Sequence, residues 1–163
     1  MIEMNNKKSY KPLPNIYCIR YKGESECDPR KCTAIKLKKF NLLKIIPSLR
    51  SSLKRAIILN PFSQNELSAD DRDLILKYGL IVLDISWKNL LKLRDLKGFK
   101  ETNGRRLPSL IAANPVNYGK WEKLNSAEAI AAALFITRFE EAAHLILSKF
   151  SWGEEFIKIN NLK

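Results

Sequence analysis

The chain has 163 residues, 45% of them apolar, and its 29 Lys and Arg against 17 Asp and Glu give a formal net charge of +12. This length and apolar content indicate a globular protein of one compact domain or two small lobes. The charge favours a polyanionic partner, RNA ahead of an anionic membrane surface. No apolar run reaches the roughly 20 residues that span a bilayer, and the first residues lack a signal-peptide core. We therefore expect a cytoplasmic protein without a membrane partner.

Apolar runs of strand length recur along the first two thirds of the chain. Residues 15–21, 56–59 and 80–83 are rich in Ile, Leu, Val and Tyr, as strands are. Residues 107–113 form a further run, which must end at Asn114-Pro115 because proline lacks a backbone donor and restricts the residue before it. Apolar strands without polar alternation, separated by helices, predict a parallel sheet covered on both faces.

Helical patterns alternate with these strands. One begins after Thr33, and another runs from a Ser68 cap to Tyr78, with Gly79 placed for a left-handed cap. A third, amphipathic pattern covers residues 90–96. Residues 41–53 fit either a strand or a buried turn.

After Asn114 the pattern changes to helices only, over residues 126–138, 139–150 and 154–160. Asn125 or Ser126 can cap the first of them, with Glu128 three residues after Asn125 as in a capping box. Alanines dominate that helix, which indicates tight helix packing or the close approach of a flat ligand. We expect two lobes: an α/β lobe with cofactor-binding strand ends over residues 1–113 and a helical lobe over 114–163 that completes the site.

Ligands of open parallel sheets bind beyond the carboxyl ends of the strands. In this chain those ends carry Asn60, residues 84–87 and residues 114–118. The basic loop 97–106 is either a solvated loop or a contact for the phosphate backbone, which would position RNA without reading its sequence.

The common catalytic sets are missing. His144 is the only histidine and lies in a helical pattern, so neither a Ser-His-Asp triad nor a His-rich zinc site can be assembled. Neither glycine-rich phosphate loop is present, which argues against a kinase or an ordinary dinucleotide enzyme. Cys18, Cys27 and Cys32 are an odd number and lack the further ligand and closer spacing of metal sites, so we expect reduced thiols and no metal.

Five segments together form a specific combination: CDPRKCT (27–33), LDISW (83–87), LPSLIAANPVNYG (107–119), LNSAEAIAAA (124–133) and FSWGEEFIKIN (150–160). Through them the chain resembles the aminocarboxypropyltransferases that modify small-subunit ribosomal RNA, in their short archaeal form. The resemblance implies a parallel-sheet, SPOUT-like knotted α/β lobe with an all-helical C-terminal lobe.

The resemblance also implies an activity. The 3-amino-3-carboxypropyl group of S-adenosyl-L-methionine would be transferred to the imide nitrogen of a pseudouridine, usually N1-methylated, in small-subunit rRNA during ribosome biogenesis. Methylthioadenosine would be released. The partner would be small-subunit rRNA or the pre-ribosomal small subunit, and we expect a monomer.

Two residues would act at the reacting groups. Trp87 matches a family tryptophan near the methyl and aminocarboxypropyl groups, where an aromatic face favours a sulfonium cation, although core packing would also explain it. Asp84 matches the acidic position of the family. It would hold the ammonium group of the cofactor or accept the imide proton, or it would be a structural cap.

The remaining cofactor-binding positions also follow from the resemblance. Thr33 would bind the carboxylate of the cofactor, and Ser126 would approach it at the alanine-rich helix. Leu83, Leu107, Asn114 and Val116 would frame adenine and ribose. Glu122, which follows Trp121, stands in the cofactor wall where the family commonly has an aromatic residue.

Two rival hypotheses remain. A SPOUT-type RNA methyltransferase would use the same cofactor and release S-adenosylhomocysteine. A basic ribosome-assembly factor would bind RNA without catalysis.

Overall fold

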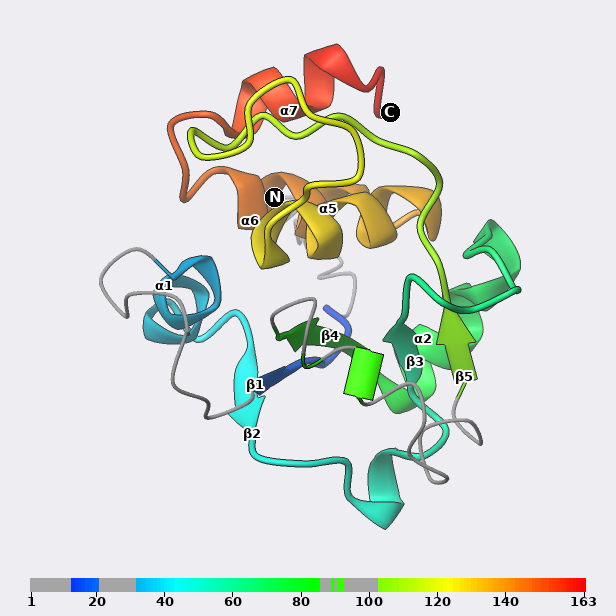
Figure 1. Cartoon of the computed structure of the whole chain (residues 1–163). Helices are drawn as coiled ribbons and strands as arrows, with labels where there is room; N and C mark the ends of the chain where they lie inside the picture. Colours follow the sequence, from blue (N-terminus) through cyan, green and yellow to red (C-terminus); the bar gives the residue numbers. More distant parts are fainter. Residues whose placement is uncertain (1–12, 21–31, 86–88, 90, 93–102) are drawn as a thin grey trace, which may run out of the picture.

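A computed structural model of the chain describes residues 13–20, 32–85, 89, 91–92 and 103–163 (Figure 1). Its centre is a five-stranded sheet in the order β2-β1-β4-β3-β5. The strands are β1 (Ile16–Arg20), β2 (Lys44–Ile46), β3 (Ile57–Leu59), β4 (Leu80–Asp84) and β5 (Asn103–Arg105). All four neighbouring pairs are parallel, which confirms the predicted α/β class.

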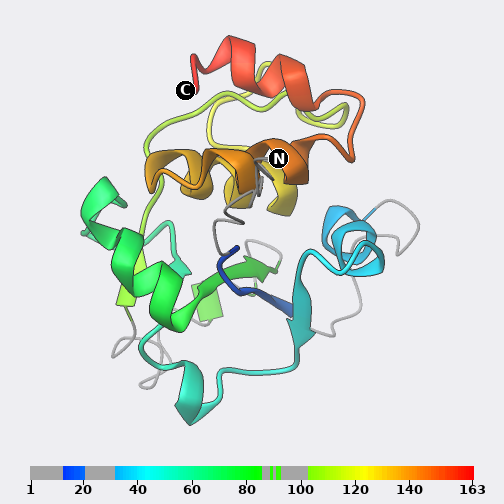
Figure 2. The ribbon, with the colours of Figure 1, turned by 180° about the vertical axis from the view of Figure 1, so that it is seen from behind.

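Helices pack around this sheet. They are α1 (Thr33–Lys39), α2 (Arg72–Tyr78), α5 (Ser126–Ile136), α6 (Glu140–Leu147) and α7 (Gly153–Ile159), with short 3-10 turns η1 (Ser51–Leu53) and η2 (Ala69–Asp71). In both views α5 and α6 form a layer next to the sheet, and α7 lies farther out beyond the chain that leads into α5 (Figures 1 and 2). No helix among the described residues is long and apolar enough to span a membrane.

The two faces of the sheet are both covered by apolar side chains. On one face Cys18, Leu80 and Val82 belong to the main core, which continues into α5, α6 and Phe156 of α7. On the other face Ile58 and Ile81 form a smaller cluster with Leu53 and Tyr78. This arrangement explains why the strands carry no polar alternation.

The two predicted N-terminal caps, at Ser68 and Asn125, are present. Ser68 and Asp71 form a capping box at η2, which leads directly into α2. Asn125 and Glu128 form another at the start of α5. Gly79 ends α2 with φ +98° but ψ 175°, so it has the positive φ of the predicted cap without its left-handed helical conformation. An added Cβ would lie 2.9 Å from the carbonyl oxygen of Asn15. Local sequence therefore determines where α2 and α5 begin and where α2 ends.

One predicted strand is wrong. Residues 107–113 do not join the sheet, and only Ile111 makes an isolated bridge, to Trp121. Pro108 has no backbone donor, and the edge of the sheet is taken by β5, inside the expected basic loop 97–106. The undecided segment 41–53 contains the short edge strand β2 and the turn η1.

Three expectations stay predictions. The amphipathic helix over 90–96 lies mostly outside the described residues. The knot and the division into lobes at residues 113 and 114 are also untested. Helix α5 packs against both α1 and β4, so the helical segment shares its core with the sheet.

Candidate functional site

A cavity of about 330 Å³ lies at the carboxyl ends of β3 and β4. Its walls come from four parts of the chain: residues 59–61 at the end of β3, Val82, Leu83 and Ile85 at the end of β4, the segment after β5, and the chain that leads into α5. This volume falls within the roughly 300–1,000 Å³ of small-molecule sites. The position is the one expected for ligands of a parallel sheet.

One wall of the cavity is a tight hairpin formed by residues 110–122, called here the 110–122 hairpin. The amide of Ala112 donates to the carbonyl of Lys120 at 2.9 Å, and the amide of Gly119 donates to the carbonyl of Ala112 at 2.8 Å. The amide of Glu122 closes the base by donating to the carbonyl of Leu110 at 2.9 Å. The hairpin places Leu110, Asn117 and Glu122 in the cavity wall.

A fully buried carboxylate joins this hairpin to α5. Oε1 of Glu128 accepts the backbone amides of Ala113 and Asn114 at 2.7 and 2.9 Å. Oε2 accepts the side-chain amide of Asn114 at 2.7 Å and the backbone amide of Asn125 at 2.9 Å. Four donors thus converge on one side chain with no solvent exposure. The capping box therefore fixes the loop as well as the helix.

Helix α7 supports the other side of the hairpin. The side-chain amide of Asn160 accepts from the amide of Ile111 at 2.8 Å and donates to its carbonyl at 2.9 Å. The hydroxyl of Tyr118 donates to Oε1 of Glu155 at 3.2 Å. This hydrogen bond raises the pKa of Tyr118, so the phenol stays a donor.

A polar cluster lies at the neighbouring strand ends. Arg20 ends β1 and pairs in register with Asp84, the last residue of β4. Oδ2 of Asp84 accepts from the thiol of Cys32 at 3.3 Å and lies 3.7 Å from Nε of Arg20. Because Cys32 precedes Thr33 at the start of α1, the Asp84 carboxylate and the first turn of α1 belong to the same edge of the site.

Cys18 lies beneath this cluster and is completely buried. Burial, helped by the negative charge of Asp84, raises the pKa of the Cys18 thiol from 9.0 to about 12. A thiol with this pKa is protonated and unreactive at neutral pH. Neither of the two described cysteines, Cys18 and Cys32, is in a disulfide.

The structure brings some of the predicted site residues together. Leu83, Leu107 and Glu122 line the cavity. Glu122 has φ 57°, an uncommon backbone conformation for a side chain of its size, and its Oε1 accepts from the hydroxyl of Ser109 at 2.8 Å. Such a conformation persists only where neighbouring contacts enforce it.

Other predicted residues do not form the walls of this cavity. Thr33, Asp84 and Ser126 are half-buried, and Asn114 is buried, with its side chain bonded to Glu128. Val116 is 81% exposed at the tip of the hairpin. Trp87 lies outside the described residues.

Several cavity residues were not identified from the sequence. They are Pro61, Val82, Pro108, Leu110, Lys123, Leu124 and Ala129, and Arg106 was identified only as part of a basic loop. Ala129 belongs to the alanine-rich helix start, for which close approach of a ligand was one of two interpretations. For the others only their proximity to a strand end or a helix cap could have served as a signal.

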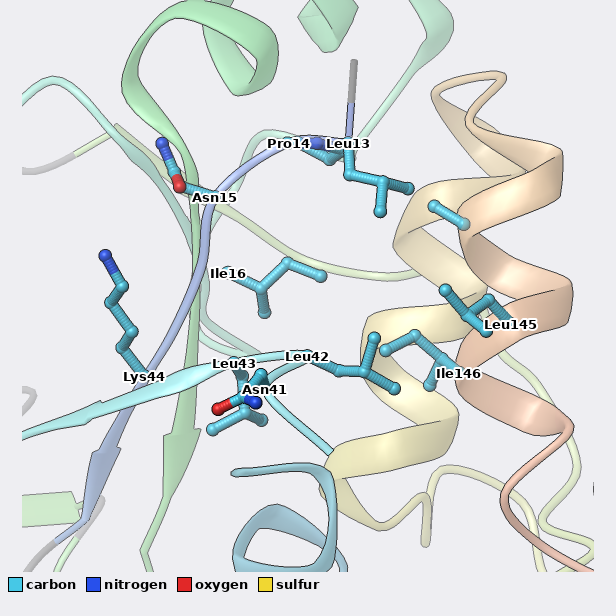
Figure 3. A pocket seen from close by; sticks show the side chains of 11 residues that line it. Leu13, Pro14, Asn15, Ile16, Asn41, Leu42, Leu43, Lys44, Leu145 and Ile146 are labelled. Atoms are coloured by element: carbon cyan, nitrogen blue, oxygen red, sulfur yellow. The ribbon is translucent and has the colours of Figure 1, made fainter. Parts of the chain in front are cut away.

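A second cavity, of about 180 Å³, lies at the opposite edge of the sheet, between the start of β1, residues 41–44 and α6. Figure 3 shows Leu42 and Ile146 pointing toward one another across it, while Lys44 extends away. It is smaller and mainly apolar. The cavity at the carboxyl ends is therefore the candidate site.

Two family models match the chain. The one described as "Ribosome biogenesis protein, C-terminal" covers residues 57–163. The other, described as "Possible Fer4-like domain in RNase L inhibitor, RLI", covers residues 16–49. The first therefore spans the candidate cavity and all of the hairpin.

The chain is also similar to named proteins. It is 46% identical over 137 residues to the 16S rRNA aminocarboxypropyltransferase of Methanosphaera stadtmanae, covering 83% of this chain and 79% of the relative. It is 47% identical over 133 residues to the enzyme of the same name from Thermoplasma volcanium, covering 82% and 78%. The solved structure of the SAM-dependent rRNA:acp-transferase Tsr3 from Vulcanisaeta distributa matches with a TM-score of 0.82 and 38% identity, covering 92% of this chain and 80% of that one.

Proposed function

The chain belongs to the 16S rRNA aminocarboxypropyltransferase family, and we propose that it transfers the 3-amino-3-carboxypropyl group of S-adenosylmethionine to the imide nitrogen of a pseudouridine in small-subunit rRNA. The pseudouridine would usually be N1-methylated beforehand. The observation that carries the proposal is the cavity at the carboxyl ends of β3 and β4, in a fold that matches an acp-transferase with a TM-score of 0.82.

The residues of the cavity suit this donor. S-adenosylmethionine combines a flat adenine, a sulfonium cation and an amino-acid end. Apolar side chains of Leu83, Leu107 and Leu124 line the cavity, and Glu122 adds a negative charge on the hairpin side. Asp84 adds another at the strand end. Apolar walls with a few placed polar groups are the usual composition of a small-molecule site.

We assign the amino-acid end to the polar cluster beside Asp84. Oδ2 of Asp84 is held by Cys32 and Arg20, which leaves Oδ1 without a hydrogen-bond donor among the described residues. That oxygen can accept from an ammonium group. Thr33, next to Cys32, would bind the carboxylate. Since Asp84 is held by a cation and a thiol, we favour the ammonium role over acceptance of the imide proton.

The adenosine end belongs to the opposite wall. Leu83 and Leu107 would enclose the adenine by apolar contact. Asn114 would act through its backbone, because its side chain is bonded to Glu128. Val116 and Ser126 would approach from the hairpin tip and the first turn of α5, and Glu122 would accept a hydrogen bond at the rim.

When bound, S-adenosylmethionine supplies an electrophilic carbon on a neutral leaving group, so the protein mainly has to position two reactants. All three carbons on the sulfur are electrophilic, and selectivity depends on which one faces the RNA. We propose that Trp87 shields the others with its aromatic face, which also favours a nearby cation. The knot, a monomeric state and a cytoplasmic location remain part of this proposal.

The test uses S-adenosylmethionine labelled separately in its methyl and carboxyl groups, incubated with the protein and 16S rRNA and followed by nucleoside analysis. Carboxyl label in a pseudouridine is expected. Methyl label alone would overturn the proposal in favour of a methyltransferase. Trp87→Ala should lose affinity for S-adenosylmethionine while keeping its affinity for RNA, which a purely RNA-binding assembly factor would not do.

A further inference from the structure

Three large side chains are unusually exposed at the outer part of the 110–122 hairpin. Val116 is 81% exposed, and Tyr118 and Trp121 are each 60% exposed. They are the three most exposed large hydrophobic residues in the described part of the chain. Their clustering within six residues is not the scattered exposure that ordinary surfaces show.

This exposure is built into an ordered structure. The backbone of Trp121 is paired with Ile111 in an isolated bridge, and the following residue, Glu122, is bonded to Leu110 and Ser109. The hydroxyl of Tyr118 donates a hydrogen bond to Glu155, which orients the ring while leaving it exposed to solvent. An aromatic surface that is rigid before binding loses little entropy when a partner stacks on it.

The same hairpin borders the cavity. Asn117 and Glu122 line it, as does Lys123 directly after the hairpin, and each is within two residues of an exposed aromatic residue. A molecule that contacts Trp121 or Tyr118 is therefore close to the cavity mouth. An RNA strand bound there would lie near the nucleoside that enters the cavity.

The surrounding charge identifies the kind of partner. Lys120 and Lys123 flank Trp121, both are exposed, and the chain as a whole carries a net charge of +12. Exposed aromatic rings between lysines are the features by which proteins bind single-stranded RNA. The rings stack on unpaired bases, and the cations contact the phosphates.

We propose that Trp121 and Tyr118 form a stacking platform for unpaired RNA bases that flank the modified nucleotide, with Lys120 on the adjoining phosphate. The platform would hold the strand beside the cavity and restrict the substrate to single-stranded segments. The identity of the RNA as small-subunit rRNA rests on the proposed function. The stacking of bases on Trp121 and Tyr118 is inferred from the hairpin alone.

The experiment measures binding of a fluorescent oligouridylate of about 12 nucleotides, within the site sizes of single-strand binders. Trp121→Ala should weaken binding about 5- to 150-fold, the range for loss of one stacked base, and Trp121→Phe should restore most of it. Lys120→Ala should lower the slope of log affinity against log salt by about 0.7, whereas Trp121→Ala should leave that slope unchanged. Leu76→Ala, an exposed apolar side chain on α2, is the matched control and should have no effect.

Unchanged affinity in Trp121→Ala, or equally weak binding in Trp121→Phe and Trp121→Ala, would overturn the platform. Wild-type preference for a duplex of the same length would overturn it as well. Transfer of carboxyl label to 16S rRNA by the wild type is measured in parallel. If the wild type transfers the label but Trp121→Ala binds normally, only the platform fails. If no label is transferred but stacking is lost in Trp121→Ala, only the proposed reaction fails.

Discussion

Asn114 donates twice to Glu128, from its backbone amide at 2.9 Å and from its side-chain amide at 2.7 Å. The first residue of the Asn-Pro loop is thereby attached to the first turn of α5. The loop positions one wall of the cavity, and α5 packs on β4, whose end forms another. One buried pair therefore sets the spacing of two cavity walls.

Replacing Glu128 should destabilise the fold. Glu128→Gln keeps the shape of the side chain but replaces one carboxylate oxygen by an NH2 group. Each oxygen of Glu128 accepts from two N–H groups, so at least two hydrogen bonds are lost in a buried site. We expect a loss of about 2–5 kcal/mol in the free energy of unfolding, measured by urea titration. Glu140→Gln, at the exposed first turn of α6, is the control and should cost under about 1 kcal/mol. Equal effects of the two variants would contradict this account of Glu128.

Asp84→Asn should weaken binding of S-adenosylmethionine. A hydrogen bond between charged groups contributes about 1.5–3 kcal/mol, which corresponds to roughly a 10- to 150-fold rise in Kd by calorimetry. The melting temperature serves as a check on folding, and the exposed Asp73→Asn on α2 is the control. Normal affinity combined with slow transfer at saturating donor would instead assign Asp84 to acceptance of the imide proton.

Cys18 should make stability depend on pH in the alkaline range. Its thiol has a pKa of about 12 in the fold against 9.0 in its ordinary state, so above pH 9 the unfolded chain loses a proton that the folded chain keeps. Stability is fully present below pH 9 and falls as pH rises toward 12. Compared with Cys18→Ala, the wild type should lose up to about 1.4 kcal/mol more per pH unit across this window. If the curves of unfolding free energy against pH are parallel for the wild type and Cys18→Ala, the pKa of Cys18 is not raised in the fold.

Gly153→Ala should disturb the corner between α6 and α7. A methyl group there would lie 2.8 Å from the carbonyl carbon of Leu147 and closer still to its oxygen. Overpacking of this kind costs about 1–3 kcal/mol, measurable by thermal unfolding. The exposed neighbour Ser151→Ala should change stability by less than about 0.5 kcal/mol. A Gly153→Ala protein as stable as the wild type would show that the corner can move freely.

The predictable parts of this protein are those with local causes. The cap at Ser68 and the capping box at Asn125 were identified because all their groups lie within three residues. Strand β5 was missed because its three residues carry no apolar pattern. It pairs with β3, and Arg105 is held by an ion pair to Asp71 at 3.0 Å, from a distant part of the chain.

The same distinction applies to the site. The resemblance identified Leu83, Leu107 and Glu122, and the strand-end rule identified Asn60, all of which line the cavity. The sequence could not show that the side chain of Asn114 belongs to a buried hydrogen-bond network, because its partner Glu128 was assigned only to a helix cap. Long-range partners of this kind are not encoded in any local spacing.

The side chain of Asn160 occupies the place that another strand would take beside Ile111, because it binds both the amide and the carbonyl of that residue. The opposite side of this short apolar segment is paired within the hairpin. Exposed edges of apolar segments recruit further chains and promote aggregation. We therefore expect Asn160→Ala to self-associate in concentrated solution, an effect that would be visible before any change in the rate of a reaction.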